Sequence, residues 1–464
     1  MNSLPYLSAI ALLLTGSVPP AAAQARPSLS AELREFVAVD TSMLALVNVR
    51  VIDGTGAPAR EEQTVVIRDG LIAAVGQAAA VPVPQGARVL DLRGHTVFPG
   101  IVGMHNHLGH AFNLNPRQDA RLYLGAGVTT IRVTGAHQPY SEINLKREID
   151  EGRSPGPRIH LTGPFVTGPG YRDLRMAQVS TPEEARRFVS HWADEGVTWI
   201  KVYTRIQRRE LAALIEEAHE RGLKVTGHLC SVTVREAAEL GIDNIEHGPD
   251  NTDFDPQKQP DVCPPDSYPH PDLSSEAVAS TIRALITNNV AITATLPEAE
   301  AYEPRRPAVD PRVFDLMHPN TLSAYHDLRT RVDQTAPAGY LAWQQAFFRT
   351  FVDAGGLMVA GIDAVFPQLR PGLSDQRNYE LLIEAGFPPE QAIKIMTANG
   401  AKLLGIDTTV GTVETGKIAD LVIIDGDPTS DTTAMRNVVL VFKGGIGYDS
   451  PKLIESVRQE VSGR

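Results

Sequence analysis

The chain has 464 residues, of which 42% are hydrophobic and 21% charged, and its formal net charge at pH 7 is −12. This length fits one large barrel with additions or two to three smaller domains, and the composition is that of a folded globular protein. Binding to nucleic acid needs an excess of Lys and Arg, so the acidic balance argues against a nucleic-acid partner.

Residues 1–23 have the features of a secretory signal peptide. The stretch PYLSAIALLLTGSV at 5–18 is apolar but too short to span a bilayer, and AAA at 21–23 offers small residues for cleavage before Gln24. The segment before the apolar stretch carries no Lys or Arg, which leaves an uncleaved membrane anchor as the alternative. We expect an exported protein, periplasmic or secreted, that is free of the membrane after cleavage.

Both ends of the mature chain have the pattern of β-structure. Residues 43–98 alternate apolar and polar side chains, and turn pairs such as Asp-Gly separate the segments. Residues 410–450 contain two segments of the same character, KIADLVIIDGDP and VVLVFKGGIGY. We expect the two ends to share one small antiparallel sheet, with a C-terminal helix or tail at 451–464.

Residues 99–409 have a different pattern, in which short apolar runs alternate with helical stretches. Two helices are clearest: TPEEARRFVSHWADEG, where Thr181 suits the N-cap and Pro182 the first turn, and RRELAALIEEAHERG. Strands that alternate with helices form a parallel sheet, and eight of them close a (β/α)8 barrel. The sequence therefore predicts an α/β fold with a TIM-like barrel. The eight apolar runs lie at 101–107, 127–135, 158–163, 198–204, 224–229, 243–248, 290–297 and 357–364.

Residues of the kinds that bind metal stand on or just after five of these runs. In a (β/α)8 barrel the carboxyl ends of the strands form the active-site face, so side chains placed there converge. Each residue alone has an ordinary explanation, such as a core histidine or a helix cap, but their joint occurrence favours a metal site. The residues are His105 and His107 at the end of the first run, Lys201 on the fourth, His228 and His247 at the ends of the fifth and sixth, and Asp363 at the end of the eighth.

Lys201 is the hardest of these residues to explain as structural. Alternation along its strand places Trp199, Lys201 and Tyr203 on one face, with Ile200 and Val202 on the other. Both faces of a parallel barrel strand are covered, so a lysine there is costly to bury as an ammonium unless it is paired or chemically altered. The position therefore indicates a functional role.

Taken together, the sequence resembles the amidohydrolase superfamily, the metal-dependent hydrolases related to urease and dihydroorotase. The resemblance rests on these ligand positions, the opening segment LRGHTVFPGIVGMHNHL, the helix PPEQAIKIMTANGAKLLGI and the exit segment GTVETGKIADLVIIDGDP. The segments IKVYT, KVTGHL and IEHG are most similar to the branch that contains imidazolonepropionase and Xaa-Pro dipeptidase, or prolidase. The resemblance implies that a β-sandwich built from both chain ends, here 43–98 and 410–450, flanks the barrel.

The resemblance also implies a binuclear metal centre. Histidine and carboxylate ligands favour zinc, with manganese, iron and cobalt as alternatives. In this arrangement one divalent ion would be held by His105, His107 and Asp363, the second by His228 and His247, and carbamylated Lys201 would bridge the two.

The function that the resemblance implies is hydrolysis of an amide or peptide bond in a small substrate, such as an Xaa-Pro-like dipeptide or an N-acyl amino acid. A hydroxide that bridges the two ions would attack the carbonyl, with Asp363 as general acid and base. Tyr203 and His137 are the candidates for binding the substrate. For Tyr203, packing under the rim is the alternative explanation.

Other functions stay open. The same site would suit a cyclic or aromatic amide, such as an imidazolone, a lactam or an ochratoxin-like toxin, because loops set the substrate on a common fold. A mononuclear deaminase fits less well, since one ion needs no bridging Lys201. A metal-bearing binding scaffold without catalytic activity is the last alternative, and the retention of all six ligand-type residues argues against it. The sequence does not decide whether the protein forms a homo-oligomer.

Cys230 and Cys263 are the two cysteines of the chain. Cys230 lies two residues after His228, and Cys263 belongs to the Pro- and Asp-rich segment 249–275 that follows the sixth run. Export would permit a disulfide that ties this segment to the rim of the barrel. We expect two free thiols, with the bridge as the alternative.

Overall fold

The computed structural model of the protein describes residues 28–109, 114–249, 251–264 and 270–463. The expected signal peptide at 1–23 lies outside the described residues, so export stays a prediction. Within the described ranges, no helix combines the length and the apolar character needed to cross a membrane.

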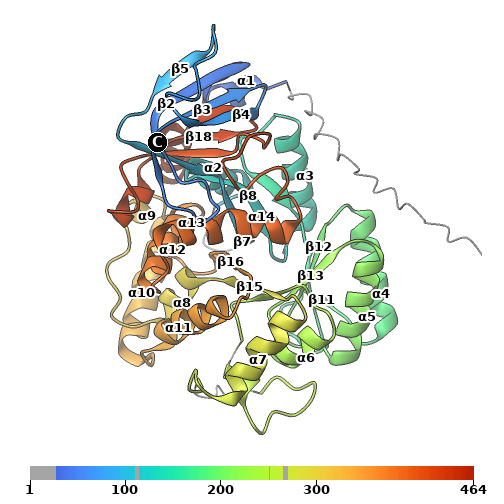
Figure 1. Cartoon of the computed structure of the whole chain (residues 1–464). Helices are drawn as coiled ribbons and strands as arrows, with labels where there is room; N and C mark the ends of the chain where they lie inside the picture. The colour runs from blue at the N-terminus through green and yellow to red at the C-terminus, as the bar shows by residue number, and fades with distance from the viewer. Residues whose placement is uncertain (1–27, 110–113, 250, 265–269, 464) are drawn as a thin grey trace, which may run out of the picture.

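Both ends of the chain contribute to one sheet, at the top of Figure 1. Its strands in the described part of the chain are β1 Val37–Val39, β2 Met43–Val51, β3 Arg60–Arg68, β4 Leu71–Gln77, β5 Arg88–Asp91, β6 His95–Pro99, β17 Leu421–Asp425, β18 Val438–Lys443 and β19 Ile446–Asp449. The strand order is β1-β19-β18-β17-β6-β2-β3-β4, with β5 paired to β2. The antiparallel pairing of β6 with β17, where Val97 lies opposite Ile423, joins the two chain ends as expected. The expectation of a small, purely antiparallel sheet was wrong, because β2 pairs in parallel with both β5 and β6 in a sheet of nine strands.

This sheet encloses an apolar core of its own. Leu46 on β2, Val65 on β3, Ile423 on β17 and Phe442 on β18 are buried in one cluster, although they come from strands at both ends of the chain. Removing such side chains from water is the main favourable contribution to folding, about 1.5–3 kcal/mol for each large one. The N-terminal and C-terminal segments therefore stabilise each other.

All eight predicted apolar runs contain a strand. These strands are β7 Ile101–Asn106, β8 Val128–Val133, β9 Arg158–His160, β12 Trp199–Val202, β13 Lys224–Gly227, β14 Asn244–Glu246, β15 Ala291–Ala294 and β16 Met358–Ala360. Two short strands, β10 Phe165–Thr167 and β11 Ala177–Gln178, were not predicted. The strands form two parallel sheets, β7-β8-β9 and β11-β10-β12-β13-β14-β15-β16, which confirms the α/β class.

Backbone hydrogen bonds join the two parallel sheets at two places. At the first place, the backbone N–H groups of Ile362 and Asp363 donate to the carbonyl oxygen of His105, so the end of β16 lies against β7. At the second place, the backbone N–H groups of Thr198 and Trp199 donate to the carbonyl oxygen of Leu161, so the start of β12 lies against the segment that follows β9. The carboxyl ends of strands from both sheets are thereby brought to one place.

Helices cover the parallel strands on their outer side (Figure 1). The N-cap predicted at Thr181 is confirmed, because its Oγ1 accepts a hydrogen bond from the Glu184 N–H at 3.2 Å. The α-helices in the described residues are α1 Ala31–Arg34, α2 Pro116–Gly125, α3 Pro139–Asp150, α4 Pro182–Asp194, α5 Arg208–Glu220, α6 Val234–Glu239, α7 Glu276–Thr287, α8 Leu296–Tyr302, α9 Pro311–Phe314, α10 Pro319–Thr335, α11 Tyr340–Asp353, α12 Leu373–Glu384, α13 Pro389–Met396, α14 Ala398–Leu404 and α15 Ser450–Ser462. Two 3-10 helices lie at Asn251–Phe254 and Thr432–Arg436.

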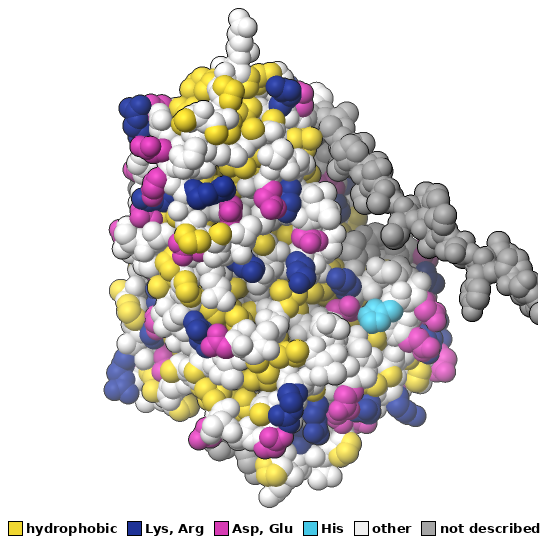
Figure 2. Space-filling model, in the orientation of Figure 1, with side chains coloured by type: hydrophobic (Ala, Val, Ile, Leu, Met, Phe, Trp, Pro, Cys, Tyr) yellow, Lys and Arg dark blue, Asp and Glu magenta, His cyan; other side chains and the backbone are white. Residues whose placement is uncertain are grey.

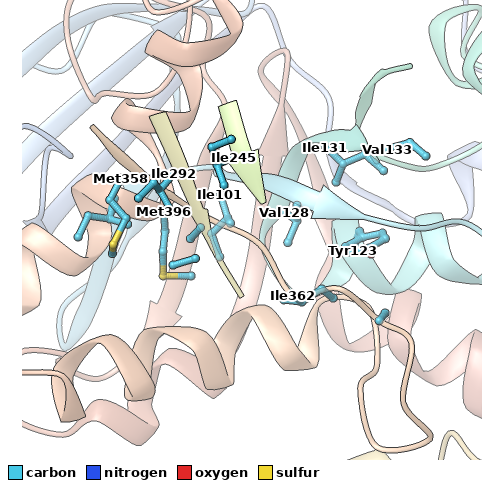
Figure 3. Packing of buried hydrophobic residues seen from close by; sticks show 14 of the residues in the cluster. Ile101, Tyr123, Val128, Ile131, Val133, Ile245, Ile292, Met358, Ile362 and Met396 are labelled. Carbon is cyan, nitrogen blue, oxygen red and sulfur yellow. The ribbon is translucent and has the colours of Figure 1, made fainter. Parts of the chain in front are cut away.

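An apolar core fills the space between strands and helices. Ile245, Ile292 and Met358 come from the neighbouring strands β14, β15 and β16, and Met396 of α13 belongs to the same cluster (Figure 3). On the face of the molecule seen in Figure 2, Lys and Arg side chains lie interspersed with Asp and Glu. The negative net charge is therefore not gathered in one patch on that face.

A disulfide joins Cys230 to Cys263, whose Cα atoms lie 5.0 Å apart. The expectation of two free thiols was therefore wrong. The segments that carry the two cysteines follow the adjacent strands β13 and β14, and the second segment folds back over the first. Lys258 adds a further contact between the two segments, because its Nζ donates to the Ser231 carbonyl oxygen at 2.7 Å.

We expect Cys263→Ser to lower the free energy of unfolding by about 3–4 kcal/mol at 25 °C. The cysteines are 33 positions apart, so the bridge closes a long loop and restricts the unfolded chain. Urea unfolding of the oxidised protein and the variant measures the difference. Reductant should lower the midpoint of the unchanged protein and leave that of the variant in place. Equal midpoints in all four samples would contradict the prediction.

Candidate active site

Three side chains that could hold a metal ion meet at the carboxyl ends of β7 and β16. The ligand atoms of His105, His107 and Asp363 all lie within 4.8 Å of one another, and all three residues are buried. His107 Nε2 is 3.0 Å from Asp363 Oδ1, and His105 Nε2 is 3.4 Å from the same oxygen. The i and i+2 spacing of the two histidines along β7 therefore aims both rings at one carboxylate.

His228 and His247 bring two further imidazoles to this place. The ring of His247 has its centroid 4.7 Å from that of His105 and 4.7 Å from that of His228. His247 Nε2 lies 3.6 Å from Asp363 Oδ2. Asp363 thus lies among His105, His107 and His247. His228 lies beside His247.

Lys201 reaches the same cluster from β12. Its Nζ is buried, and no hydrogen-bond partner for it exists among the described residues. Burial lowers the pKa of the Lys201 ammonium to about 8, while the charges of Glu246 and Asp363 act in the opposite direction. The structure therefore brings all six predicted residues together, with the amine near enough to Glu246 and Asp363 for their charges to act on it.

Backbone geometry at two of these residues is unusual. His247 has a φ of 65° and Asp363 a φ of 45°, in the left-handed region that non-glycine residues seldom adopt. Such conformations cost about 1–3 kcal/mol each and persist where the surroundings require them. Gly361 shows why β16 approaches β7 so closely, since a Cβ atom there would lie 2.4 Å from His105 Cβ. The fold thus accepts local strain to aim these side chains inward.

The two candidates for substrate binding lie on one side of the cluster, around a residue that the sequence did not reveal. Phe165 of β10 has its ring centroid 5.8 Å from His107, 5.2 Å from His137 and 5.6 Å from Tyr203. Tyr203 also lies 5.1 Å from the His228 ring. Burial lowers the pKa of His137 to about 4, so this imidazole is neutral at pH 7. Tyr203 and His137 therefore flank the ligand residues as expected.

A pocket of about 960 Å³ opens beside His228 and His247. Its far wall is aromatic, because His270 stacks on Trp343 of α11 with ring centroids 4.4 Å apart. Glu298 and Tyr302 of α8 also line it. Space of this size next to the ligand residues accommodates a small substrate.

The family model for the amidohydrolase family matches residues 96–446, which include all six of these residues. The chain belongs to the amidohydrolase family. This membership confirms the resemblance seen in the sequence and places the protein among hydrolases that act on carbon–nitrogen bonds and generally bind divalent metal ions.

Individual relatives agree with this family. The chain is 24% identical over 442 residues to an imidazolonepropionase from Porphyromonas gingivalis. This match covers 82% of this chain and 85% of that enzyme. It is also 24% identical over 204 residues to an enamidase from Eubacterium barkeri, and this match covers 41% of the chain but only half, 50%, of the enamidase. A solved protein from Bifidobacterium longum, described as a candidate prolidase, is 25% identical, with a TM-score of 0.69 over 91% of this chain and 99% of that one.

Proposed function

We propose that this amidohydrolase is a binuclear metal-dependent enzyme that cleaves an amide or peptide bond in a small substrate, such as an Xaa-Pro-like dipeptide or an N-acyl amino acid. The observation that carries the proposal is the convergence of His105, His107 and Asp363 with two further histidines and a buried lysine. The similarity to a candidate prolidase over nearly the whole chain supports the dipeptide as substrate.

The proposal includes the architecture that positions this site. We propose that the two parallel sheets close into a (β/α)8 barrel over 99–409 and that the nine-stranded sheet forms a β-sandwich from 43–98 and 410–450. The backbone hydrogen bonds between β7 and the end of β16, and between the end of β9 and β12, support the closure. The separate core of the nine-stranded sheet supports the second domain.

The residues present fit a pair of divalent ions. Imidazole nitrogens and a carboxylate are the ligands that zinc prefers, and they lie close enough to share an ion. Two buried polar atoms, Lys201 Nζ and His247 Nε2, have no hydrogen-bond partner among the described residues. Leaving such atoms unsatisfied is costly, so ions bound between them explain their orientation.

Carbamylation of Lys201 is the second part of the proposal. The neutral Nζ adds to the carbon of carbon dioxide: an N–C bond forms, one C=O π bond opens and leaves its electron pair on oxygen, and a proton passes from the nitrogen to solvent. The product is a carboxylate with two oxygens in place of a buried cation. It would bridge two cations, whereas an ammonium group among four imidazoles would repel them.

The side chains divide the remaining work between them. Divalent ions, when bound, would activate a water molecule and polarise the substrate carbonyl. Asp363 is placed to accept the proton of that water and to pass it to the leaving amine, since its carboxylate lies at the centre of the ligand cluster. Tyr203 and His137 would orient the substrate from the side of Phe165.

A cyclic amide is the second candidate substrate. A relative that matches 82% of this chain is an imidazolonepropionase, and its name indicates a cyclic amide as substrate. We therefore propose to compare dipeptide, N-acyl amino acid and cyclic amide libraries on one preparation that holds metal. Removal of metal with a chelator should abolish turnover, and zinc with bicarbonate should restore it. A preparation with two ions per chain that hydrolyses no amide would contradict the proposed activity and favour a binding scaffold.

We expect Tyr203→Phe to raise KM about 10-fold and to leave kcat nearly unchanged, because one hydrogen bond to the substrate is lost in both ground and transition states. Burial raises the pKa of Tyr203, so its hydroxyl stays protonated and can donate. Steady-state kinetics measure the effect. Tyr448→Phe is the matched control, since Tyr448 is a buried tyrosine in β19 of the other sheet. An unchanged KM in Tyr203→Phe would show that Tyr203 only packs under the rim.

A further inference from the structure

A buried charged pair that the proposed mechanism does not use lies beneath the ligand cluster. Glu246, at the end of β14, and Arg132, on β8, are 1% and 0% exposed. Arg132 Nη2 donates to Glu246 Oε1 at 2.5 Å. Burying two charges costs free energy that a surface pair avoids, so their place in the interior of the strands calls for an explanation.

Both oxygens of the Glu246 carboxylate are occupied. Oε2 lies 2.8 Å from Nδ1 of the ligand residue His105. Oε1 accepts from Arg132 and from the Thr226 hydroxyl. An ionised carboxylate can only accept, so Nδ1 of His105 must carry the hydrogen. When the imidazole of His105 is neutral, the lone pair that can bind a metal ion is therefore on Nε2. This nitrogen lies 3.4 Å from Asp363 Oδ1.

Arg132 in turn is held on several sides. Its Nη1 donates to Asn244 Oδ1 at 2.9 Å, and its Nη2 also donates to the Met104 carbonyl oxygen. The guanidinium lies over the Trp199 ring, 4.6 Å from the centroid. The cation that neutralises Glu246 is therefore fixed by neighbouring strands and does not compete for the ligand side of the cluster.

We propose that Glu246 is a positioning residue of the metal centre, which fixes the tautomer and the ring orientation of His105, and that Arg132 holds Glu246 in place. This inference rests on the proposed metal site. Glu246 directly precedes His247, so one strand end supplies a ligand of one ion and the support for a ligand of the other. Residues that orient metal-binding histidines in this way typically contribute 10- to 100-fold to metal affinity.

The test is the affinity of the full chain for zinc in the absence of substrate, measured by competition with a chromophoric chelator. Glu246→Gln keeps the shape of the side chain but places an NH₂ group opposite either His105 Nδ1–H or Arg132, both of which are donors. We expect zinc affinity to fall about 10- to 100-fold in this variant. An affinity equal to that of the unchanged protein would overturn the inference.

The matched control removes the charge from another ion pair whose carboxylate is buried and whose arginine is half-buried. Asp420, 3% exposed, accepts from Arg158 at 2.9 Å beside the nine-stranded sheet. We expect Asp420→Asn to leave zinc affinity unchanged. An equal loss of zinc affinity in this control would mean that general destabilisation explains the effect. This result would contradict the inference.

A milder variant covers the case in which Glu246→Gln does not fold. Thr226→Val removes one hydrogen bond to Glu246 Oε1 and keeps the shape of the side chain, so zinc affinity should fall about 2- to 10-fold. No change in this variant would overturn the inference. Because no substrate is used, the result is separate from the proposed activity: a protein that binds zinc in this Glu246-dependent way but cleaves no amide would contradict only the activity.

Discussion

Lys201→Ala is expected to lower kcat/KM by about 10³-fold or more and to leave at most one metal ion per chain. Nζ is the group on which the bridging carboxylate would form, and a second cation among the histidines needs that negative charge. Metal content by mass spectrometry and steady-state kinetics measure the two effects. Bicarbonate should raise the metal content of the unchanged protein and have no effect on the variant.

Lys443→Met is the control for this experiment. Lys443 is a half-buried lysine of β18, and its Nζ donates to the Gly156 carbonyl oxygen at 2.8 Å, in the other sheet. Its replacement should leave metal content and kcat/KM unchanged. Two ions per chain in Lys201→Ala would show that the lysine does not bridge them.

The second large effect is expected for Asp363→Asn, which should lower kcat about 10²- to 10⁴-fold. Asparagine keeps the size of the side chain but cannot accept a proton as a base. The loss should fall on kcat more than on KM, because proton transfer belongs to the transition state. Steady-state kinetics on metal-loaded protein provide the measurement.

Asp375→Asn serves as the matched control for Asp363. Asp375 is a buried carboxylate that accepts from the Gly372 N–H at 3.0 Å at the start of α12. Its replacement should affect stability and leave kcat in place. A different result would contradict the prediction. If Asp363→Asn kept kcat within a few-fold of that of the unchanged protein, and Asp375→Asn lowered kcat more, Asp363 would not be the general base.

The sequence predicted the eight principal strands because each is an apolar run bounded by turn residues or helices. It predicted that the candidate ligand residues would lie close together because the strand-end rule turns scattered histidines into neighbours. It did not predict β10, which has only three residues and follows directly on β9. Phe165, which stands between His107, His137 and Tyr203, was missed with it.

Glu246 and Arg132 were also missed, although a signal for them exists. Arg132 interrupts the apolar segment TTIRV as Lys201 interrupts WIKV, so the same argument about buried charge applies to both. The disulfide had no comparable signal, because it depends on the path of a long segment with little periodicity. The sequence also carried no signal for Glu298 and Trp343. Their positions in the pocket wall depend on how two helices pack.

We propose that six side chains from five strands hold two divalent ions around a carbamylated Lys201. Anomalous diffraction from crystals grown with zinc and bicarbonate tests it most directly. We expect two zinc peaks, both within the cluster of four histidines and Asp363, and added density on Lys201 Nζ. A single peak, peaks outside this cluster, or an unmodified amine directed away from it would contradict the account.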